Sequence, residues 1–127
     1  MIRRILLIGS VILILVIVAA SLVPGGWRPH TPLHTTFEHF VAYGLVTFWF
    51  TIVLARLSAR VLAAAGLIGL SVAMEVAQVF IPQRGAALVD IYFSAAGVVS
   101  GLLAGLLVIG VFTLAKNLLV PANDVSR

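Results

Sequence analysis

Polar side chains that could do chemistry recur in this chain at helical spacing and form three short stripes. Residues three or four apart lie on one face of a helix, because each residue turns the chain by about 100°. The stripes are His39, Tyr43 and Thr47; Ser71, Glu75 and Gln78; and Asp90, Ser94, Gly97, Gly101 and Gly105. An ionisable group in apolar surroundings is costly unless it is paired. We therefore expect the stripes to face one another and to form a single polar pocket.

Glu75 is the strongest candidate for a functional residue. Its carboxylate could take up a proton or bind a cationic group, or it could be a buried electrostatic strut paired with Arg84 or His39. The sequence leaves both interpretations open. In either of them, Gln78 and Tyr43 would orient the carboxylate.

The other polar candidates each have a structural interpretation beside a functional one. His39 could carry a proton or bind a metal, but we favour a role as the structural partner of Glu75. We expect Asp90 to cap the N-terminus of a helix and to complement its dipole. Arg84 either binds a phosphate or carboxylate from a lipid headgroup or cell-wall precursor, or forms a salt bridge with Asp90.

No metal site or cofactor is expected from the sequence. His30, His34 and His39 have a spacing that suggests zinc, but Pro32 interrupts them and no recognised ligand pattern results. The absence of cysteine excludes a disulfide framework, a thiol nucleophile and thiolate metal ligands. No activated nucleophile with an orienting partner is visible, which disfavours a membrane hydrolase or transferase.

The composition places these residues in a membrane protein. The chain has 127 residues, of which 62% are hydrophobic and only 9% are charged, whereas a soluble domain carries about 25% charged residues. Eight basic and four acidic residues give a net charge of +4. The basic residues are scattered between the apolar runs, so we interpret them as topology signals and expect no nucleic-acid partner.

Four apolar runs predict an all-α fold, a polytopic bundle of four transmembrane helices in a single domain over residues 1–127. The runs cover about 5–23, 37–57, 61–81 and 91–114, and roughly 20 such residues cross a bilayer. The first run could instead be a secretory signal, but its length favours a retained anchor. Residues 121–127 are expected to form a short solvated tail.

Loop charge predicts the orientation of the bundle. Only Arg28 and Arg84 fall on one side, and the remaining basic residues fall on the other: Arg3, Arg4, Arg56, Arg60, Lys116 and Arg127. By the positive-inside rule, both termini are cytoplasmic. The polar pocket then opens toward the extracytoplasmic face.

The polar residues also resemble a family motif. Residues from Glu75 to Arg84 read Glu-Val-Ala-Gln-Val-Phe-Ile-Pro-Gln-Arg, and Asp90, Gly97 and Gly101 follow. This pattern resembles the E-x-x-Q-x-F-x-P-x-R...D...G-x-x-x-G signature of VanZ-like membrane proteins, a family named after a protein linked to resistance to the glycopeptide teicoplanin. The resemblance implies a bacterial cell-envelope protein in the cytoplasmic membrane.

A second part of the chain extends the resemblance to about residues 37–105. His39-Phe40-Val-Ala-Tyr43 matches the H-F-x-x-Y of the family's preceding helix. The chain departs from the family in two places: Thr35-Thr36 stands where Asp-Lys is frequent, and Ser94 stands where Asn is frequent. Both departures remove polar or charged capacity from these positions.

These observations favour a protein that recognises or shields an amphiphilic ligand among the membrane lipids: a lipid headgroup, a lipid-linked cell-wall precursor or a lipophilic drug. Arg84 and His39 would meet an anionic headgroup, with Glu75, Gln78 and Tyr43 beneath. A small proton-coupled transporter that uses Glu75 and a structural membrane subunit are the alternatives. The glycines at 97, 101 and 105 are expected to pack helices closely, and the oligomeric state stays open.

Overall fold

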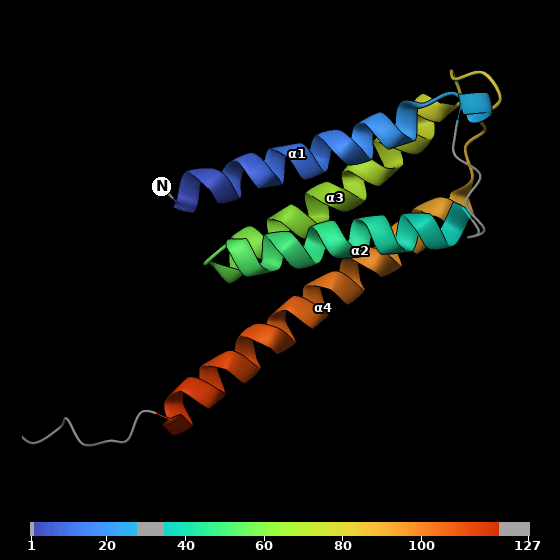
Figure 1. Ribbon diagram of the computed structural model, residues 1–127. Coiled ribbons are helices and arrows are strands. Elements are labelled where there is room, and N and C mark those ends of the chain that lie inside the picture. The colour runs from blue at the N-terminus through green and yellow to red at the C-terminus, as the bar shows by residue number, and fades with distance from the viewer. Residues whose placement is uncertain (1, 28–34, 120–127) are drawn as a thin grey trace, which may run out of the picture.

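The computed structural model describes residues 2–27 and 35–119, and this part of the chain is entirely helical apart from its turns. Four α-helices follow one another, with one short 3-10 helix, η1, at Gly25–Trp27 (Figure 1). They are α1 (Ile2–Leu22), α2 (Thr35–Val53), α3 (Leu57–Gln78) and α4 (Leu88–Leu119). Each is long and apolar enough to cross a membrane. The predicted all-α class with four apolar helices is confirmed.

The helix ends differ from the ends of the apolar runs by up to five residues, because side-chain polarity does not mark where main-chain hydrogen bonding stops. α3 ends at Gln78, although the apolar run continues to Ile81. There the N–H groups of Phe80 and Ile81 bond carbonyls three residues back, at 3.1 Å each, a pattern tighter than that of an α-helix. Pro82 follows and has no N–H to continue the helix.

Successive helices run in opposite directions along the bundle (Figure 1). The ends of α1 and α3 therefore lie together with the beginnings of α2 and α4. This end, which we call the polar end, carries His39, Glu75 and Asp90. Ile2 and Leu119, the outermost helical residues of the described chain, lie toward the opposite end.

The closest packing joins α2 to α4, which are not neighbours in the sequence. Gly97 lies against the carbonyl oxygen of Phe40, and Gly101 lies against that of Gly44. A Cβ atom at either α4 position would overlap these main-chain atoms. Gly105 continues the contact, and a Cβ there would come within 2.6 Å of a threonine methyl group of α2. Small residues at these positions let the two backbones approach closely.

The interior of the bundle is more polar than its surface. Large apolar side chains such as Ile8, Leu62 and Leu107 are exposed. The buried polar residues are Ser10, Thr47, Thr51, Ser71, Glu75, Gln78, Asp90 and Ser94. A soluble protein shows the reverse distribution, and an apolar surface around a polar interior suits a lipid environment.

Trp49 makes a hydrogen bond between α2 and α1 that its apolar neighbours in the sequence do not indicate. Its indole N–H donates to the hydroxyl of Ser10 at 3.1 Å, and that hydroxyl donates to the carbonyl of Leu6 at 3.0 Å. Trp49 thus ties α2 to α1 away from the polar end. The sequence could not show this, because Ser10 is an isolated hydroxyl in an otherwise apolar run.

We expect Gly101→Ala to lower the stability of the protein. The new methyl group has to push apart two backbones, and overpacking of this kind typically costs about 1–3 kcal/mol. The measurement is thermal unfolding in detergent, followed by tryptophan fluorescence. Gly110→Ala on the same helix is the matched control, because nothing lies within 4 Å of its added Cβ. Equal unfolding temperatures for the two variants would contradict the glycine contact.

Candidate functional site

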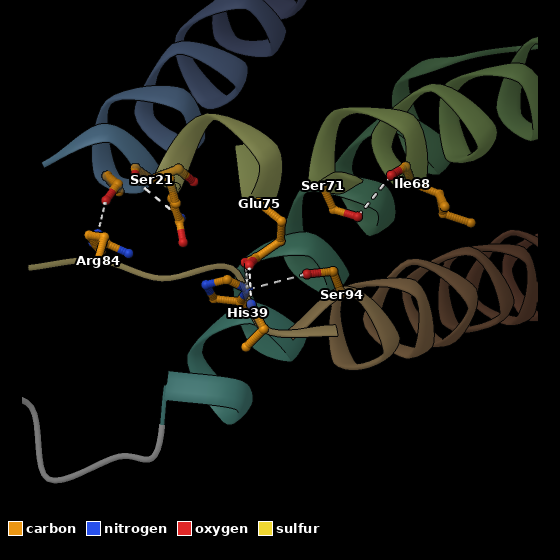
Figure 2. A network of polar contacts seen from close by, with 10 residues as sticks. Ser21, His39, Ile68, Ser71, Glu75, Arg84 and Ser94 are labelled. Carbon is orange, nitrogen blue, oxygen red and sulfur yellow. Dashed lines mark hydrogen bonds and ion pairs between the residues drawn. The ribbon is translucent and has the colours of Figure 1, made fainter. Parts of the chain in front are cut away.

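Three helices bring polar groups together at the polar end. Glu75 Oε1 of α3 lies 3.7 Å from His39 Nδ1 of α2. Ser94 Oγ of α4 lies 3.5 Å from the same nitrogen. Figure 2 shows the Glu75 carboxylate and the Ser94 hydroxyl pointing toward the His39 ring. Asp90 joins them, because His39, Glu75 and Asp90 each offer one atom within 4.8 Å of the others.

The positions of these residues in their helices explain why they meet. His39 is in the second turn of α2, Glu75 is three residues from the end of α3, and Asp90 is in the first turn of α4. At about 1.5 Å of rise per residue, all three lie within about 6 Å of the same end of the bundle. We call His39, Glu75, Asp90 and Ser94 the carboxylate cluster.

Glu75 connects two helices through its carboxylate. Oε2 accepts a 2.9 Å hydrogen bond from the main-chain N–H of Ala87, the residue directly before α4. This bond caps the start of α4 with a side chain from α3. The other oxygen, Oε1, has no hydrogen-bond partner within the residues that the structure describes. Glu75 is 2% exposed, so this oxygen is also shielded from solvent.

The interpretation of Asp90 as the N-cap of the last helix is wrong. α4 begins at Leu88, so Asp90 is already the third helical residue, and its N–H donates to the carbonyl of Ala87 at 2.9 Å. The first polar residue of this segment is not the helix boundary, because Leu88 and Val89 before it belong to the helix as well. The acidic group still lies near the positive end of the helix dipole. Asp90 is 7% exposed, and its Oδ1 has no hydrogen-bond partner in the described part of the chain.

Gln78 and Arg84 hold the end of α1, a role that the sequence did not indicate. Gln78 Nε2 donates to the carbonyl of Ser21 at 3.2 Å. Arg84 donates from Nε to the carbonyl of Val23 at 3.1 Å and from Nη2 to that of Ala20 at 3.0 Å. The last carbonyls of a helix have no partner inside it, so these side chains satisfy α1 and fasten it to the polar end (Figure 2).

A pocket of about 150 Å³ adjoins the carboxylate cluster. Its walls come from α1, from the first turns of α2 and from the turn before α4. The lining residues are Ile17, Ala20, Ser21, Glu38, His39, Ala42, Tyr43 and Arg84. We call it the α1–α2 pocket. The hydroxyl of Tyr43 is buried and has no hydrogen-bond partner among the described residues.

The polar residues that the sequence placed in one pocket lie in two adjoining groups at the polar end. His39, Tyr43 and Arg84 line the α1–α2 pocket, and Glu75 and Asp90 belong to the carboxylate cluster. His39 is common to both. The sequence did not indicate the contribution of α1. The run that forms α1 is almost wholly apolar, and the main-chain carbonyls that α1 contributes are a feature of every helix.

Some residues considered from the sequence lie outside the described part of the chain. They include Arg28, His30 and His34, and also the tail at residues 121–127. Of the three histidines compared with a zinc site, only His39 is placed, and it lies beside Glu75 and Asp90.

No family model matches this chain, and no curated protein or solved structure matches it either. The resemblance to VanZ-like proteins thus stays a prediction from the motif.

We expect Arg84→Met to loosen the end of α1. A hydrogen bond to a charged group contributes about 1.5 kcal/mol or more, so losing two of them should speed local amide exchange by about tenfold or more. Hydrogen–deuterium exchange of peptides covering residues 17–27 measures this. Arg60→Met is the control. Arg60 Nε makes the same kind of bond, to the carbonyl of Leu54 at 2.8 Å, but in the α2–α3 connection, far from the end of α1. Unchanged exchange at α1 in Arg84→Met would contradict the proposed fastening.

Proposed function

We propose that this chain is an integral membrane protein of the VanZ-like kind that binds the phosphate-bearing headgroup of an amphiphile in the α1–α2 pocket. The observation that carries the proposal is the pocket itself, where Arg84, His39 and Tyr43 line one space beside apolar surface. Amphiphile headgroups need such a combination, because their polar part and their chains have to be accommodated side by side.

The polar groups of the pocket suit a phosphate. Arg84 brings the positive charge of a guanidinium to the pocket, which attracts phosphate, and the bonds from its Nε and Nη2 to α1 fix its position. His39 is a further hydrogen-bonding group of the pocket, and Tyr43 lines it with a buried hydroxyl that has no partner among the described residues. Glu38 lines the same pocket, so a headgroup that carries an ammonium group besides its phosphate would complement both signs of charge.

The volume of the pocket favours a headgroup over a whole drug. Drug-sized ligands occupy sites of about 300–1,000 Å³, and this pocket has about 150 Å³. A lipid or a lipid-linked cell-wall precursor would place only its polar end inside. Ile17, Ala20 and Ala42 line the pocket and would lie against the start of the hydrocarbon chains.

We also propose that the polar end faces the extracytoplasmic side of the bacterial cytoplasmic membrane and that both termini are cytoplasmic. Charge supports this orientation. Arg56 and Arg60 lie at the α2–α3 connection, opposite the polar end, and Arg4 and Lys116 lie near the outer ends of α1 and α4. Basic residues favour the cytoplasmic side.

Cysteine labelling tests the orientation cleanly, because the chain has no cysteine of its own. We expect Gly85→Cys, in the turn before α4, to react with a membrane-impermeant maleimide on intact cells. Ser58→Cys, at the start of α3, should react only after the membrane is opened. Both positions are exposed, and nothing lies within 4 Å of a Cβ added at Gly85. The reverse labelling pattern would overturn the orientation.

We expect Ala42→Phe to weaken headgroup binding by at least about tenfold, because the added ring occupies the space that the headgroup needs. The measurement is lipid retention in native mass spectra of the full-length protein, titrated with a phosphatidylethanolamine and with a neutral diacylglycerol. The wild-type protein should retain the phospholipid and release the diacylglycerol. Ala73→Phe on the exposed side of α3 is the matched control.

Two results would count against headgroup binding. One is equal phospholipid retention by wild-type protein and Ala42→Phe. The other is proton-coupled flux of a lipophilic cation in proteoliposomes that disappears in Glu75→Gln and persists in Ala42→Phe. The second result would favour the transporter.

A further inference from the structure

The carboxylate cluster contains two buried acidic residues, Glu75 and Asp90, that headgroup binding does not use. His39, Glu75 and Asp90 come from three different helices, and each offers one potential ligand atom within 4.8 Å of the others. We propose that these three residues bind one divalent transition-metal ion, of the Zn²⁺ or Mn²⁺ class. The proposal goes beyond headgroup binding, because Glu75 and Asp90 do not line the α1–α2 pocket.

Two buried oxygens point to a missing partner. Glu75 Oε1 and Asp90 Oδ1 have no hydrogen-bond partner within the described residues, although both residues are more than nine-tenths buried. Buried polar atoms are nearly always paired, and an unpaired carboxylate oxygen is costly. A metal ion accepts electron pairs from such oxygens and at the same time supplies positive charge.

Charge balance favours a divalent ion. Two ionised carboxylates carry a charge of −2, and a protonated His39 could offset only half of it. One divalent ion with a neutral imidazole leaves the cluster with no net charge. Neutrality matters in this position, because buried charge at the apolar interior of a bundle is penalised.

The donor atoms match the proposed class of ion. Zn²⁺ binds imidazole nitrogen and carboxylate oxygen at about 2.0–2.2 Å, and carboxylates also suit Mn²⁺. Ligand atoms around one ion then lie about 3–3.5 Å apart, so His39 Nδ1 and Glu75 Oε1, at 3.7 Å, need to move little. The N–H of Ala87 fixes the other oxygen of Glu75, which is the kind of outer contact that orients a metal ligand.

The test uses tag-free, full-length protein in detergent. The protein is stripped with a chelator, equilibrated with Zn²⁺ or with Mn²⁺, desalted, and analysed for bound metal by mass spectrometry. We expect about one ion per chain and a higher unfolding temperature with the ion than without it. Glu75→Gln and Asp90→Asn should each weaken binding by at least about tenfold.

Two controls separate this site from others on the chain. Glu38→Gln removes a carboxylate that lines the neighbouring pocket, and it should bind the ion like the wild type. A double variant, His30→Gln with His34→Gln, removes the other two histidines of the chain and should also retain the ion. X-ray absorption of the Zn²⁺-loaded wild-type protein should show imidazole and oxygen ligation, which tests the site even where a variant fails to fold.

Several results would overturn the proposal: less than stoichiometric binding by the wild type, an ion retained in both Glu75→Gln and Asp90→Asn, loss of the ion with His30 and His34, or ligation without imidazole. Headgroup binding is judged separately, since Ala42→Phe should keep the ion. Asp90→Asn should keep the phospholipid. The two proposals can therefore fail independently.

Discussion

The close contact between α2 and α4 is the constraint on which the polar end depends. Because Gly97 and Gly101 have no side chains, the carbonyl oxygens of Phe40 and Gly44 lie directly against the α4 backbone. This approach brings the first turns of α2 beside the first turns of α4, and His39 beside Ser94. A bundle with ordinary helix spacing would leave these groups too far apart to interact. The glycines thus position the site without contributing a functional group to it.

The α3–α4 connection supplies the next part of the site. The carboxylate of Glu75 accepts the N–H of Ala87, so the beginning of α4 is bound to α3 as well as to α2. One carboxylate oxygen has this structural task, and the other faces His39. Glu75 can therefore cap α4 and interact with His39 at the same time, because a different oxygen of its carboxylate makes each contact.

The sequence predicted the parts of this arrangement that follow from helical periodicity. The stripe on α3 and the stripe on α4 are buried throughout, because an apolar helix turns its few polar residues inward. Hydrogen bonds between side chains and main-chain carbonyls were not predictable. Arg84 Nε and Nη2 bond carbonyls of α1, which are partners beyond the carboxylate or anion that the sequence suggests. Every residue type has a carbonyl, so no pattern of side chains could reveal these partners.

The carboxylate cluster and the α1–α2 pocket lie side by side at the polar end, and different contacts build them. The carboxylate cluster is built from α2, α3 and α4, which are joined by main-chain contact and by the Glu75–Ala87 bond. The α1–α2 pocket lies beside α1, whose contacts at this end include the bonds from Gln78 and Arg84. Ile17 also packs α1 into the apolar core of the bundle. His39 joins the two regions, because it lines the α1–α2 pocket while its Nδ1 lies 3.7 Å from Glu75 Oε1.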